Sequence, residues 1–586
     1  MKFRRGHSLF VALLLTAAPI AAAPADDLKS VIADHWAWSL SVDPFLATQV
    51  GERSADGKLP DPSLAEADRQ AVTAQGFITR LDKIDAAALS PGDRVNRDVL
   101  RRMLAGQVDG NRFGQRAMTF TTYSGWHTGF AGYPESVRLE TRADYDHYLE
   151  RLATYPAFNK AEIDVTRTGL QAGYAQPCAP MVGFETSITT HIVAKPEDSV
   201  FWAPFAKPRP AYVSEADWSA MQARARTLIT TAIVPAYRDF LTFYTKEYQP
   251  KCRTTVGIGA TPGGAAYYAY RAREMTTTAM TPEAIHQLGL SEVARINAAM
   301  DKVAADAGFP DRKAFVEHLR SDPKYYAKSP QELLDKSAFM AKTIDDWLPR
   351  IIGKLPRLPF SVKPIPADQA EGTTTAYSEW GSAATGRAGV YRVNTTHLDQ
   401  RPLYELPALT LHEAAPGHQT QGSLQQELAL PDFRKYQVSF TAFVEGWALY
   451  SESLGEEMGL YDTPEKKMGR YSYEMWRACR LVVDTGMHVK GWSRDKAIDY
   501  MMANTALSRH NVEAEVNRYI TWPGQALAYK IGELTIKRLR AKAEAALGSK
   551  FDERGFHDAI LENGPVPMDV LETHVDDWIT SRKAVS

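Results

Sequence analysis

Four prolines lie within the segment KLPRLPFSVKPIP, residues 354–366. Proline removes a backbone hydrogen-bond donor and clashes with the preceding helical turn, so this segment cannot be a helix. Apolar residues recur at three- and four-residue intervals before it, for example at 28–42, 66–84 and 224–248, and again from Leu403 almost to the end. We therefore expect a mainly α protein in which the proline-rich segment is a seam between two helical parts.

The stretch that follows the seam has a different pattern. In residues 373–398, β-branched and aromatic residues alternate with polar ones and glycines interrupt them, which predicts short strands. One earlier helix has legible ends, because Thr281 fits an N-cap, Pro282 the first helical position and Gly308 the stop. The expected architecture is a large helical body with one small β-sheet.

Residues 1–25 have the layout of a secretory signal peptide, with basic residues, a short apolar run and then small residues. Cleavage fits after Ala23 or after Ala25, and we favour the second site because Pro24 would follow the first cut. The alternative is a membrane anchor, but the apolar run is short and interrupted by Pro19. The mature protein is expected to be periplasmic or secreted.

Charge and composition exclude some classes of protein. The formal net charge is −2, and removal of the three basic residues of the leader makes it about −5. Basic residues are scattered among acidic ones, so we expect no nucleic-acid partner, and no later segment is apolar enough to span a membrane. We expect residues 26–353, a helical region, and residues 354–586, the catalytic region, to form one continuous domain. The sequence does not indicate an oligomeric state.

Three cysteines remain in a chain that we expect to fold in an oxidising compartment. Cys178 and Cys252 lie in similar proline-containing stretches, and we expect them to form a disulfide. Cys479 lies in a helical pattern and is expected to be a buried free thiol.

Residues 412–418 read HEAAPGH. A zinc-binding helix normally carries two histidines at i and i+4, whereas His412 and His418 are six positions apart and would diverge in a regular helix. Pro416 and Gly417 could correct this by bulging two residues out of the helix. Glu413 would then be the carboxylate that takes a proton from a metal-activated water. The alternative is a helix that ends near Ala415, with the second histidine in a loop.

A third ligand is needed for a catalytic zinc. Glu445 lies in the apolar helical stretch FVEGWALYSE, residues 443–452, where a buried carboxylate is costly unless it is paired or bound to a metal. Glu452 lies seven residues later on the same face and could support a histidine ligand. The expected cofactor is one zinc ion held by His412, His418 and Glu445, although a core ion pair is an alternative role for Glu445.

These motifs resemble the bacterial family known as domain of unknown function 885. The resemblance extends over nearly the whole mature chain, in the stretches 190–202, 276–296, 412–421, 443–452, 480–492 and 518–534. It implies a relationship to zinc peptidases whose third ligand is a glutamate. Their wider relatives, of the angiotensin-converting-enzyme and thimet-oligopeptidase type, are helical and have a deep cleft. Those relatives carry the strict H-E-x-x-H motif, from which this chain departs.

An oxyanion donor is supplied in similar enzymes by a tyrosine and a histidine of a later helix. Tyr519 is the first candidate for this role and Tyr529 the second, each with the alternative of a satisfied core hydroxyl. Asp484 and His488, four residues apart, could form a pair that donates to the substrate, or could belong to a structural network. His510 is a weaker substitute for His488. Further candidates for substrate binding are Arg509, Arg518 and Gln525, and the two arginines would suit a peptide carboxylate.

The leading interpretation is a secreted zinc peptidase that hydrolyses short peptides, with Glu413 as general base and proton shuttle. The strand expected at 389–398 could hold an extended peptide by backbone pairing, as the edge strand beside the zinc does in similar enzymes, or it could be a purely structural strand. One alternative is an amidase acting on a non-peptide or modified small-molecule amide. Another is a catalytically silent protein that binds peptides or metal.

Overall fold

The computed structural model describes residues 24–584, apart from 123, 138, 367–369, 371–372 and 384–385. All but the last two residues of the expected signal peptide therefore lie outside the described residues. Within the part of the chain that is described, no helix is both long and apolar enough to cross a membrane.

The protein is mainly helical, as expected. The first part contains α1 (Pro24–Val42), α2 (Pro44–Val50), α3 (Leu64–Leu81), α4 (Pro91–Asn111), α5 (Trp126–Ala131), α6 (Tyr133–Ser136), α7 (Arg142–Gln171), α8 (Thr186–Thr189), α9 (Ala203–Ala206), α10 (Glu215–Leu228), α11 (Val234–Phe243), α12 (Gly264–Thr276), α13 (Pro282–Asp306), α14 (Arg312–Ser321), α15 (Pro330–Asp345) and α16 (Leu348–Ile351). After the sheet come α18 (Leu406–Glu413), α19 (His418–Glu427), α20 (Asp432–Tyr436), α21 (Thr441–Leu454), α22 (Pro464–His488), α23 (Arg494–Asn504), α24 (Arg509–Thr521), α25 (Ala528–Leu547), α26 (Glu553–Leu561) and α27 (Met568–Ala584).

Local chemistry explains several helix ends. The hydroxyl of Thr281 accepts a hydrogen bond from the backbone N–H of Ala284, and Pro282 opens α13, which confirms the predicted start. The chain leaves α13 through Gly308 at φ 82°, a conformation that glycine adopts without a steric penalty. The proline-rich seam contains no helix, as predicted, and forms strand β1 (Phe360–Pro364).

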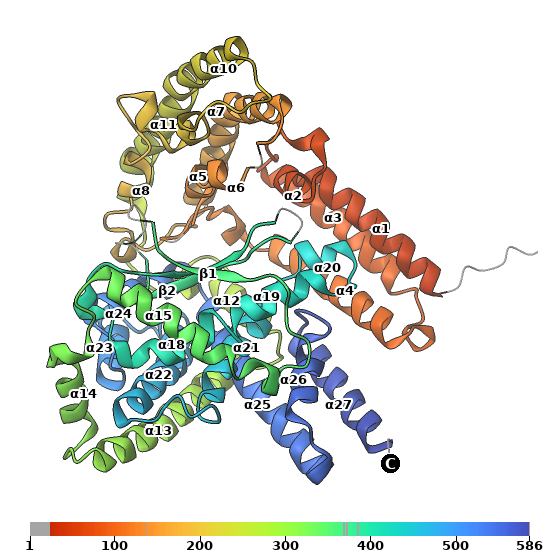
Figure 1. Ribbon diagram of the computed structural model, residues 1–586. Coiled ribbons are helices and arrows are strands. Elements are labelled where there is room, and N and C mark those ends of the chain that lie inside the picture. Colours follow the sequence, from red (N-terminus) through yellow and green to blue (C-terminus); the bar gives the residue numbers. More distant parts are fainter. Residues whose placement is uncertain are drawn as a thin grey trace, which may run out of the picture.

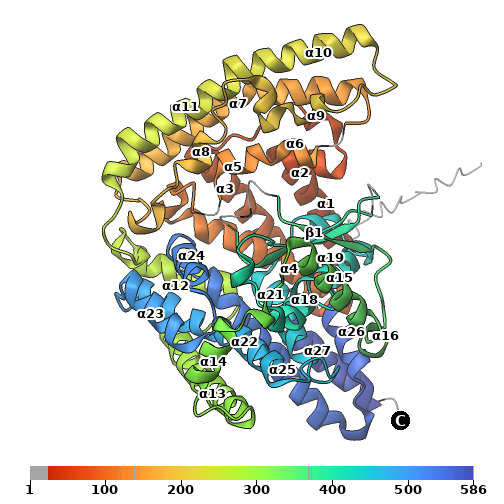
Figure 2. The same ribbon diagram turned by 60° about the vertical axis from the view of Figure 1, so that its left-hand side comes forward.

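Helices α5 to α11 form a lobe at the top of the molecule (Figures 1 and 2). An aromatic core fills it, with buried side chains that include Phe130, Tyr155 and Tyr237. The predicted disulfide joins Cys178 to Cys252, and Cys479 is a buried free thiol, so both predictions are confirmed.

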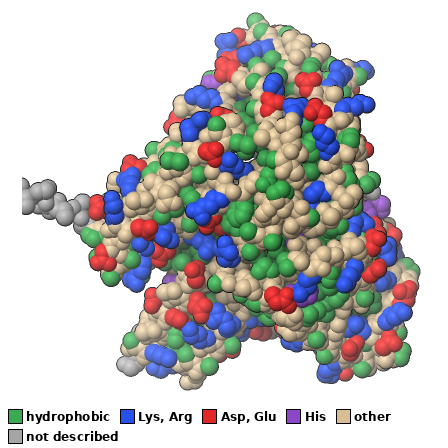
Figure 3. Space-filling model, turned by 180° about the vertical axis from the view of Figure 1, so that it is seen from behind, with side chains coloured by type: hydrophobic (Ala, Val, Ile, Leu, Met, Phe, Trp, Pro, Cys, Tyr) green, Lys and Arg blue, Asp and Glu red, His purple; other side chains and the backbone are tan. Residues whose placement is uncertain are grey.

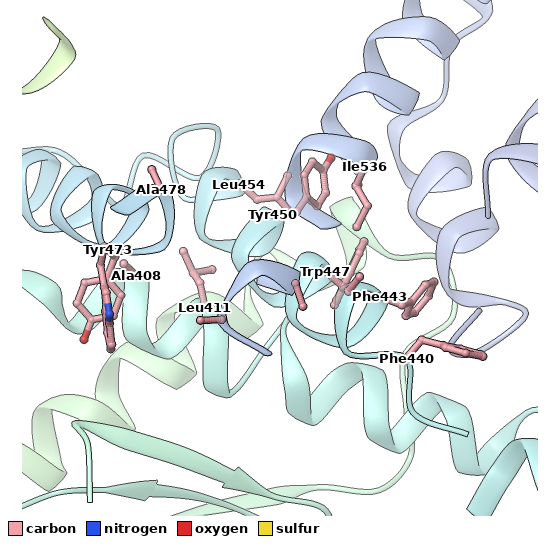
Figure 4. Close-up of a cluster of buried hydrophobic side chains, with 14 of the residues drawn as sticks. Ala408, Leu411, Phe440, Phe443, Trp447, Tyr450, Leu454, Tyr473, Ala478 and Ile536 are labelled. Atoms are coloured by element: carbon pink, nitrogen blue, oxygen red, sulfur yellow. The ribbon is translucent and has the colours of Figure 1, made fainter. Parts of the chain in front are cut away.

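A second, larger core joins α1, α3 and α4 to α13–α15 and to most helices after residue 403. Helix α13 packs along α22, and α21 packs along α25. Figure 4 shows Phe443, Trp447 and Tyr450 of α21 close to Ile536 of α25. Burying one such side chain contributes about 1.5–3 kcal/mol to folding. The two cores do not coincide with the two regions that we expected on either side of the boundary between residues 353 and 354. The division into those regions stays a prediction.

The small sheet has the order β1-β3-β2, with β2 (Ala376–Glu379) and β3 (Gly389–Val393) inside the predicted stretch. Strand β3 runs parallel to β1 and antiparallel to β2. Strand β3 is therefore central, and the expectation that 389–398 provides the edge for a peptide is wrong, because both sides of β3 are paired. The edge near the HEAAPGH helices is β2, which contacts α18 and α19.

Candidate metal centre

The two histidines of HEAAPGH belong to different helices. Helix α18 ends at Glu413 and α19 begins at His418. Between them, Ala414 (φ −99°, ψ −107°) and Gly417 (φ −68°, ψ −132°) leave the helical region, and the peptide bond before Pro416 is cis. The turn brings the two imidazole rings together, with centroids 4.9 Å apart and planes at 89°.

The prediction of a bulge inside one continuous helix is therefore wrong, although its consequence, the convergence of the two histidines, is present. The turn is tight, because a Cβ on Gly417 would lie 2.0 Å from the backbone oxygen of His412. It is also held from outside, since the indole N–H of Trp447 donates to the oxygen of Pro416 at 2.8 Å. The chain must break here because proline cannot continue the hydrogen-bond ladder of α18.

Glu445 of α21 completes a three-residue cluster. One carboxylate oxygen lies 3.4 Å from Nε2 of His412 and 3.3 Å from Nε2 of His418, and the three possible ligand atoms lie within 4.8 Å of one another. These two distances are longer than good N–H···O hydrogen bonds, which measure about 2.7–3.2 Å. Two ligands of a tetrahedral zinc, each about 2.0–2.1 Å from the ion, are about 3.3–3.5 Å apart. The oxygen has no hydrogen-bond partner among the described residues, so the donor set fits a zinc ion.

Glu452 orients the first histidine, as the spacing on α21 suggested. Its carboxylate lies 2.8 Å from Nδ1 of His412, so an N–H there donates to Glu452 and the Nε2 lone pair faces Glu445. Burial lowers the pKa of His412, but the two carboxylates outweigh this effect and raise it to about 9. Burial opposes ionisation of Glu445, but the charges of His418 and His412 lower the pKa of this carboxyl well below its usual range. His412 therefore holds a proton that a metal ion would displace.

Glu413 lies beside this cluster on the last turn of α18. Ser378 of β2 donates to a carboxylate oxygen of Glu413 at 3.0 Å and also contacts its backbone oxygen. The strand therefore fixes the carboxylate that a hydrolase of this type would use as its base.

A cavity of about 480 Å³ opens on the cluster. Its wall comes from β2 and the residues before it, from α18, α19 and α21, and from α22, α24 and α25. The lining side chains include Thr373, Thr374, Thr375, Tyr377, Ser378, Trp380, Tyr473, Trp476, Arg477, Arg480, Glu515, Arg518 and Tyr529. A volume of this size suits a small molecule or a short peptide.

The family model described as "Bacterial protein of unknown function (DUF885)" matches residues 44–575. The chain belongs to the DUF885 family. It is similar to a solved structure from Colwellia psychrerythraea described as a "putative lipoprotein", with a TM-score of 0.88 and 25% identity over 95% of this chain and 100% of that chain. A second solved structure, from Shewanella oneidensis, is described as "a putative lipoprotein of unknown function". It has a TM-score of 0.71 and 19% identity over 94% of this chain and 99% of that chain, a likeness that shows the fold. No curated protein matches the sequence.

Tyr519 of this DUF885 protein does not point into the cavity. It is 1% exposed, and its hydroxyl donates to Glu515 at 2.6 Å while it accepts from Trp476 and Arg480. Burial raises the pKa of this hydroxyl further above its usual value. The first choice of oxyanion donor is therefore wrong, because this hydroxyl is committed to the carboxylate.

Tyr529, the second choice, is better placed. Its ring lies 6.4 Å from the ring of His412 at an interplanar angle of 15°. Its hydroxyl accepts a weak hydrogen bond of 3.4 Å from Gln525, and its own proton has no acceptor among the described side chains. Burial and the charge of Glu445 raise the pKa of Tyr529, so the group keeps its proton and can donate it.

The predicted pair of Asp484 and His488 does not form. Asp484 accepts from the hydroxyl of Tyr268 and from the N–H of Gly524. His488 accepts from the N–H of Ile258 at Nδ1, and its Nε2 faces a backbone oxygen. Both residues belong to a structural network that ties α22 to α12, which was the alternative interpretation.

The remaining candidates separate clearly. Arg509 and His510 are exposed on α24 outside the cavity wall, and Arg509 pairs with Glu513. Arg518 lines the cavity, and Gln525 accepts from it at 2.8 Å from behind the wall.

Sequence reasoning missed Ser378 as a contact of Glu413 and Arg480 as a cavity residue. Tyr473, Trp476, Arg477 and Arg480 follow one another at helical spacing on α22, and this stripe was the available signal.

Proposed function

We propose that this DUF885 protein is a zinc-dependent hydrolase that cleaves amide bonds in short peptides. The observation that carries the proposal is the convergence of His412, His418 and Glu445 on one point beside Glu413 and the cavity. When bound, the ion supplies a Lewis acid that lowers the pKa of a water molecule and polarises a carbonyl.

The chain's own residues supply the proton transfers. Glu413, fixed by Ser378, takes a proton from the attacking water and passes it to the leaving amine. Tyr529 donates its hydroxyl proton to the oxygen on which negative charge develops. Among the described strands, β2 pairs with β3 alone, so its other edge can hold an extended peptide by backbone hydrogen bonds.

We place the protein outside the cytoplasm. Support comes from the expected leader at residues 1–25 and from the disulfide, which is typical of oxidising compartments. The description of the two similar solved structures as lipoproteins also favours the cell envelope.

The test compares metal content and turnover in the same samples. Purified protein should hold about one equivalent of zinc, and peptides from a mixed library should be cut, with products read by mass spectrometry. Glu413→Gln should keep the zinc and lower kcat about 10²–10⁴-fold. Glu456→Gln, the same change at an exposed position, should match the parent protein. Full activity in Glu413→Gln, or in protein stripped of zinc by a chelator, would contradict the proposal.

A further inference from the structure

Three arginines form one wall of the cavity, which we call the arginine wall. Arg477 and Arg480 come from α22 and Arg518 comes from α24. They are 4%, 2% and 6% exposed, so their charges are largely removed from bulk water. A buried charge is costly unless it is paired. The partners of these guanidinium groups therefore decide whether the wall is electrically complete.

The wall has more positive charge than its carboxylates neutralise. Arg480 and Arg518 share one carboxylate, Glu515, which accepts from Arg480 at 2.8 Å and from Arg518 at 2.9 Å. Glu515 also accepts from Tyr519, so its oxygens are fully used. Burial opposes its ionisation, but the two arginines outweigh this effect and lower its pKa to about 2. Two guanidinium groups against one ionised carboxylate leave one positive charge.

Hydrogen-bonding capacity is also left over. Nη1 of Arg480 and Nε of Arg477 are buried and have no hydrogen-bond partner among the described residues. Nε and Nη2 of Arg480 are already committed, to Tyr519 and Glu515. An arginine carries five N–H donors in a fork that matches a carboxylate. The wall thus has both a surplus charge and unused N–H donors on two neighbouring arginines.

We propose that the arginine wall binds a carboxylate group of the substrate, with Arg480 and Arg477, which carry the unused donors, as the main contacts. This inference rests on the proposed hydrolase function and adds a substrate class, anionic peptides. The carboxylate can be the free C-terminus of the peptide or the side chain of an acidic residue. Both have the same chemistry, and the test below separates them.

The position of the wall limits where the carboxylate lies along the substrate. The ring of Tyr529 lies near both the wall and the metal cluster, with its centroid 4.3 Å from the guanidinium carbon of Arg480 and 6.4 Å from the ring of His412. The guanidinium is therefore within about 11 Å of the His412 ring. One or two residues of extended chain, at about 3.3–3.6 Å each, together with the contact distances at their two ends, can span this length. The recognised carboxylate belongs to the first or second residue beyond the bond that is cut.

The test measures binding first and turnover second. Calorimetry on zinc-loaded Glu413→Gln protein compares acetyl-Ala-Phe with its carboxamide and with acetyl-Ala-Glu-amide. The free acid, the glutamate peptide or both should bind about 10–100-fold more tightly than the neutral carboxamide, as expected for hydrogen bonds to a charged group. Preference for the acid alone assigns the wall to a C-terminal carboxylate, and preference for the glutamate peptide assigns it to a side chain. Equal binding of all three peptides would overturn the inference.

Variants then connect the preference to the wall. Arg480→Gln should abolish most of the preference, and Arg480→Lys should retain part of it, because lysine keeps the charge but loses the fork. Lys467→Gln removes the same charge from an exposed position of α22 and should keep the full preference. Thermal unfolding identifies variants that fail to fold. The comparison of the three peptides uses protein in which Arg480 is intact, so it does not depend on these variants.

Turnover of the same peptides by the parent protein separates the two proposals. Cleavage of the anionic and neutral peptides at equal kcat/KM would retain the hydrolase and remove the carboxylate site. Anion-selective binding without any cleavage would retain the carboxylate site and remove the hydrolase.

Discussion

Replacement of Glu452 by glutamine should weaken zinc binding without removing any ligand. Glu452 lies 2.8 Å from Nδ1 of His412 and 2% of it is exposed, so the contact is direct and shielded from water. Glutamine keeps the shape and can still accept a hydrogen bond, but it removes the negative charge that fixes the N–H on Nδ1 and makes Nε2 more basic.

The magnitude follows from the type of bond that changes. A hydrogen bond to a charged group contributes about 1.5–3 kcal/mol and a neutral one about 0.5–1.5 kcal/mol. The difference, about 1.4 kcal/mol, corresponds to a tenfold weaker affinity for zinc. Arg477 lies 3.4 Å from the same carboxylate, so the free energy of unfolding should fall as well.

Competition with a fluorescent zinc chelator at fixed pH measures the affinity, and thermal unfolding of the same samples measures the stability. Glu456→Gln is the matched control, because it makes the same change four residues later, at an exposed side chain just past the end of α21. If Glu452→Gln binds zinc as tightly as the parent protein, the argument that this carboxylate orients His412 as a ligand is refuted.

Three further predictions concern the turn, the proton and the tyrosines. Gly417→Ala should lower the free energy of unfolding by about 1–3 kcal/mol and weaken zinc binding, because the new methyl group would lie 2.0 Å from a backbone oxygen. The control Gly76→Ala places its methyl group where nothing lies within 4 Å, so denaturant titrations should find it neutral or stabilising. In zinc-free protein the pKa of His412 is raised from 6.5 to about 9. This shift should add about 3 kcal/mol to the free energy of unfolding below pH 6.5, and the contribution should be lost as the pH rises through 9. An equal free energy of unfolding at pH 6 and pH 10 would contradict this assignment. Tyr529→Phe should lower kcat about 10²–10³-fold in steady-state kinetics. Tyr519→Phe should mainly lower the free energy of unfolding, by about 1–3 kcal/mol in unfolding curves. The reverse pattern would return the oxyanion role to Tyr519.

The features that the sequence predicted correctly depend on local chemistry. The cap of α13 at Thr281 and the non-helical proline segment follow from side-chain and backbone preferences within a few residues. Glu452 was placed beside a histidine because residues seven apart share a helix face. The pairing of Cys178 with Cys252 depended on a similar local context and is also present.

The features that were missed depend on tertiary contacts. Tyr519 and Tyr529 lie in one polar and aromatic stretch, and only the packing of α24 and α25 around Glu515 decides which hydroxyl stays available. His488 lies on the same helix as the cavity stripe but eight residues past Arg480, or about 12 Å along the axis at 1.5 Å per residue. The order in which strands pair cannot be predicted from the sequence of one strand, so β3 was mistaken for the edge of the sheet.

The break between α18 and α19 connects the local and the tertiary levels. Local rules identify Pro416 and Gly417 as helix breakers, which is correct. The same rules predict that histidines six positions apart diverge, whereas the two rings lie 4.9 Å apart. The disagreement disappears because the break is held by distant residues, Trp447 through a hydrogen bond and Ser378 through Glu413. A sequence that violates a local pattern while distant contacts stabilise the violation is what a functional site is expected to show. The two residues beyond the usual spacing allow histidines from separate helices to meet Glu445, and α21 supplies both that carboxylate and the tryptophan that holds the turn.

Figure 3 shows that basic and acidic side chains are interspersed on the rear face of the molecule, so charge does not distinguish that face. The cavity is different, because its arginine wall keeps a surplus positive charge away from bulk water. Glu515 pairs with two arginines of the wall, Glu452 contacts both His412 and Arg477, and Glu445 belongs to the metal cluster. Under the proposal, an anionic group of the substrate accepts from the unused donors of Arg480 and Arg477. If both proposals hold, one cavity has a cation site at His412, His418 and Glu445 and an anion site at the arginine wall.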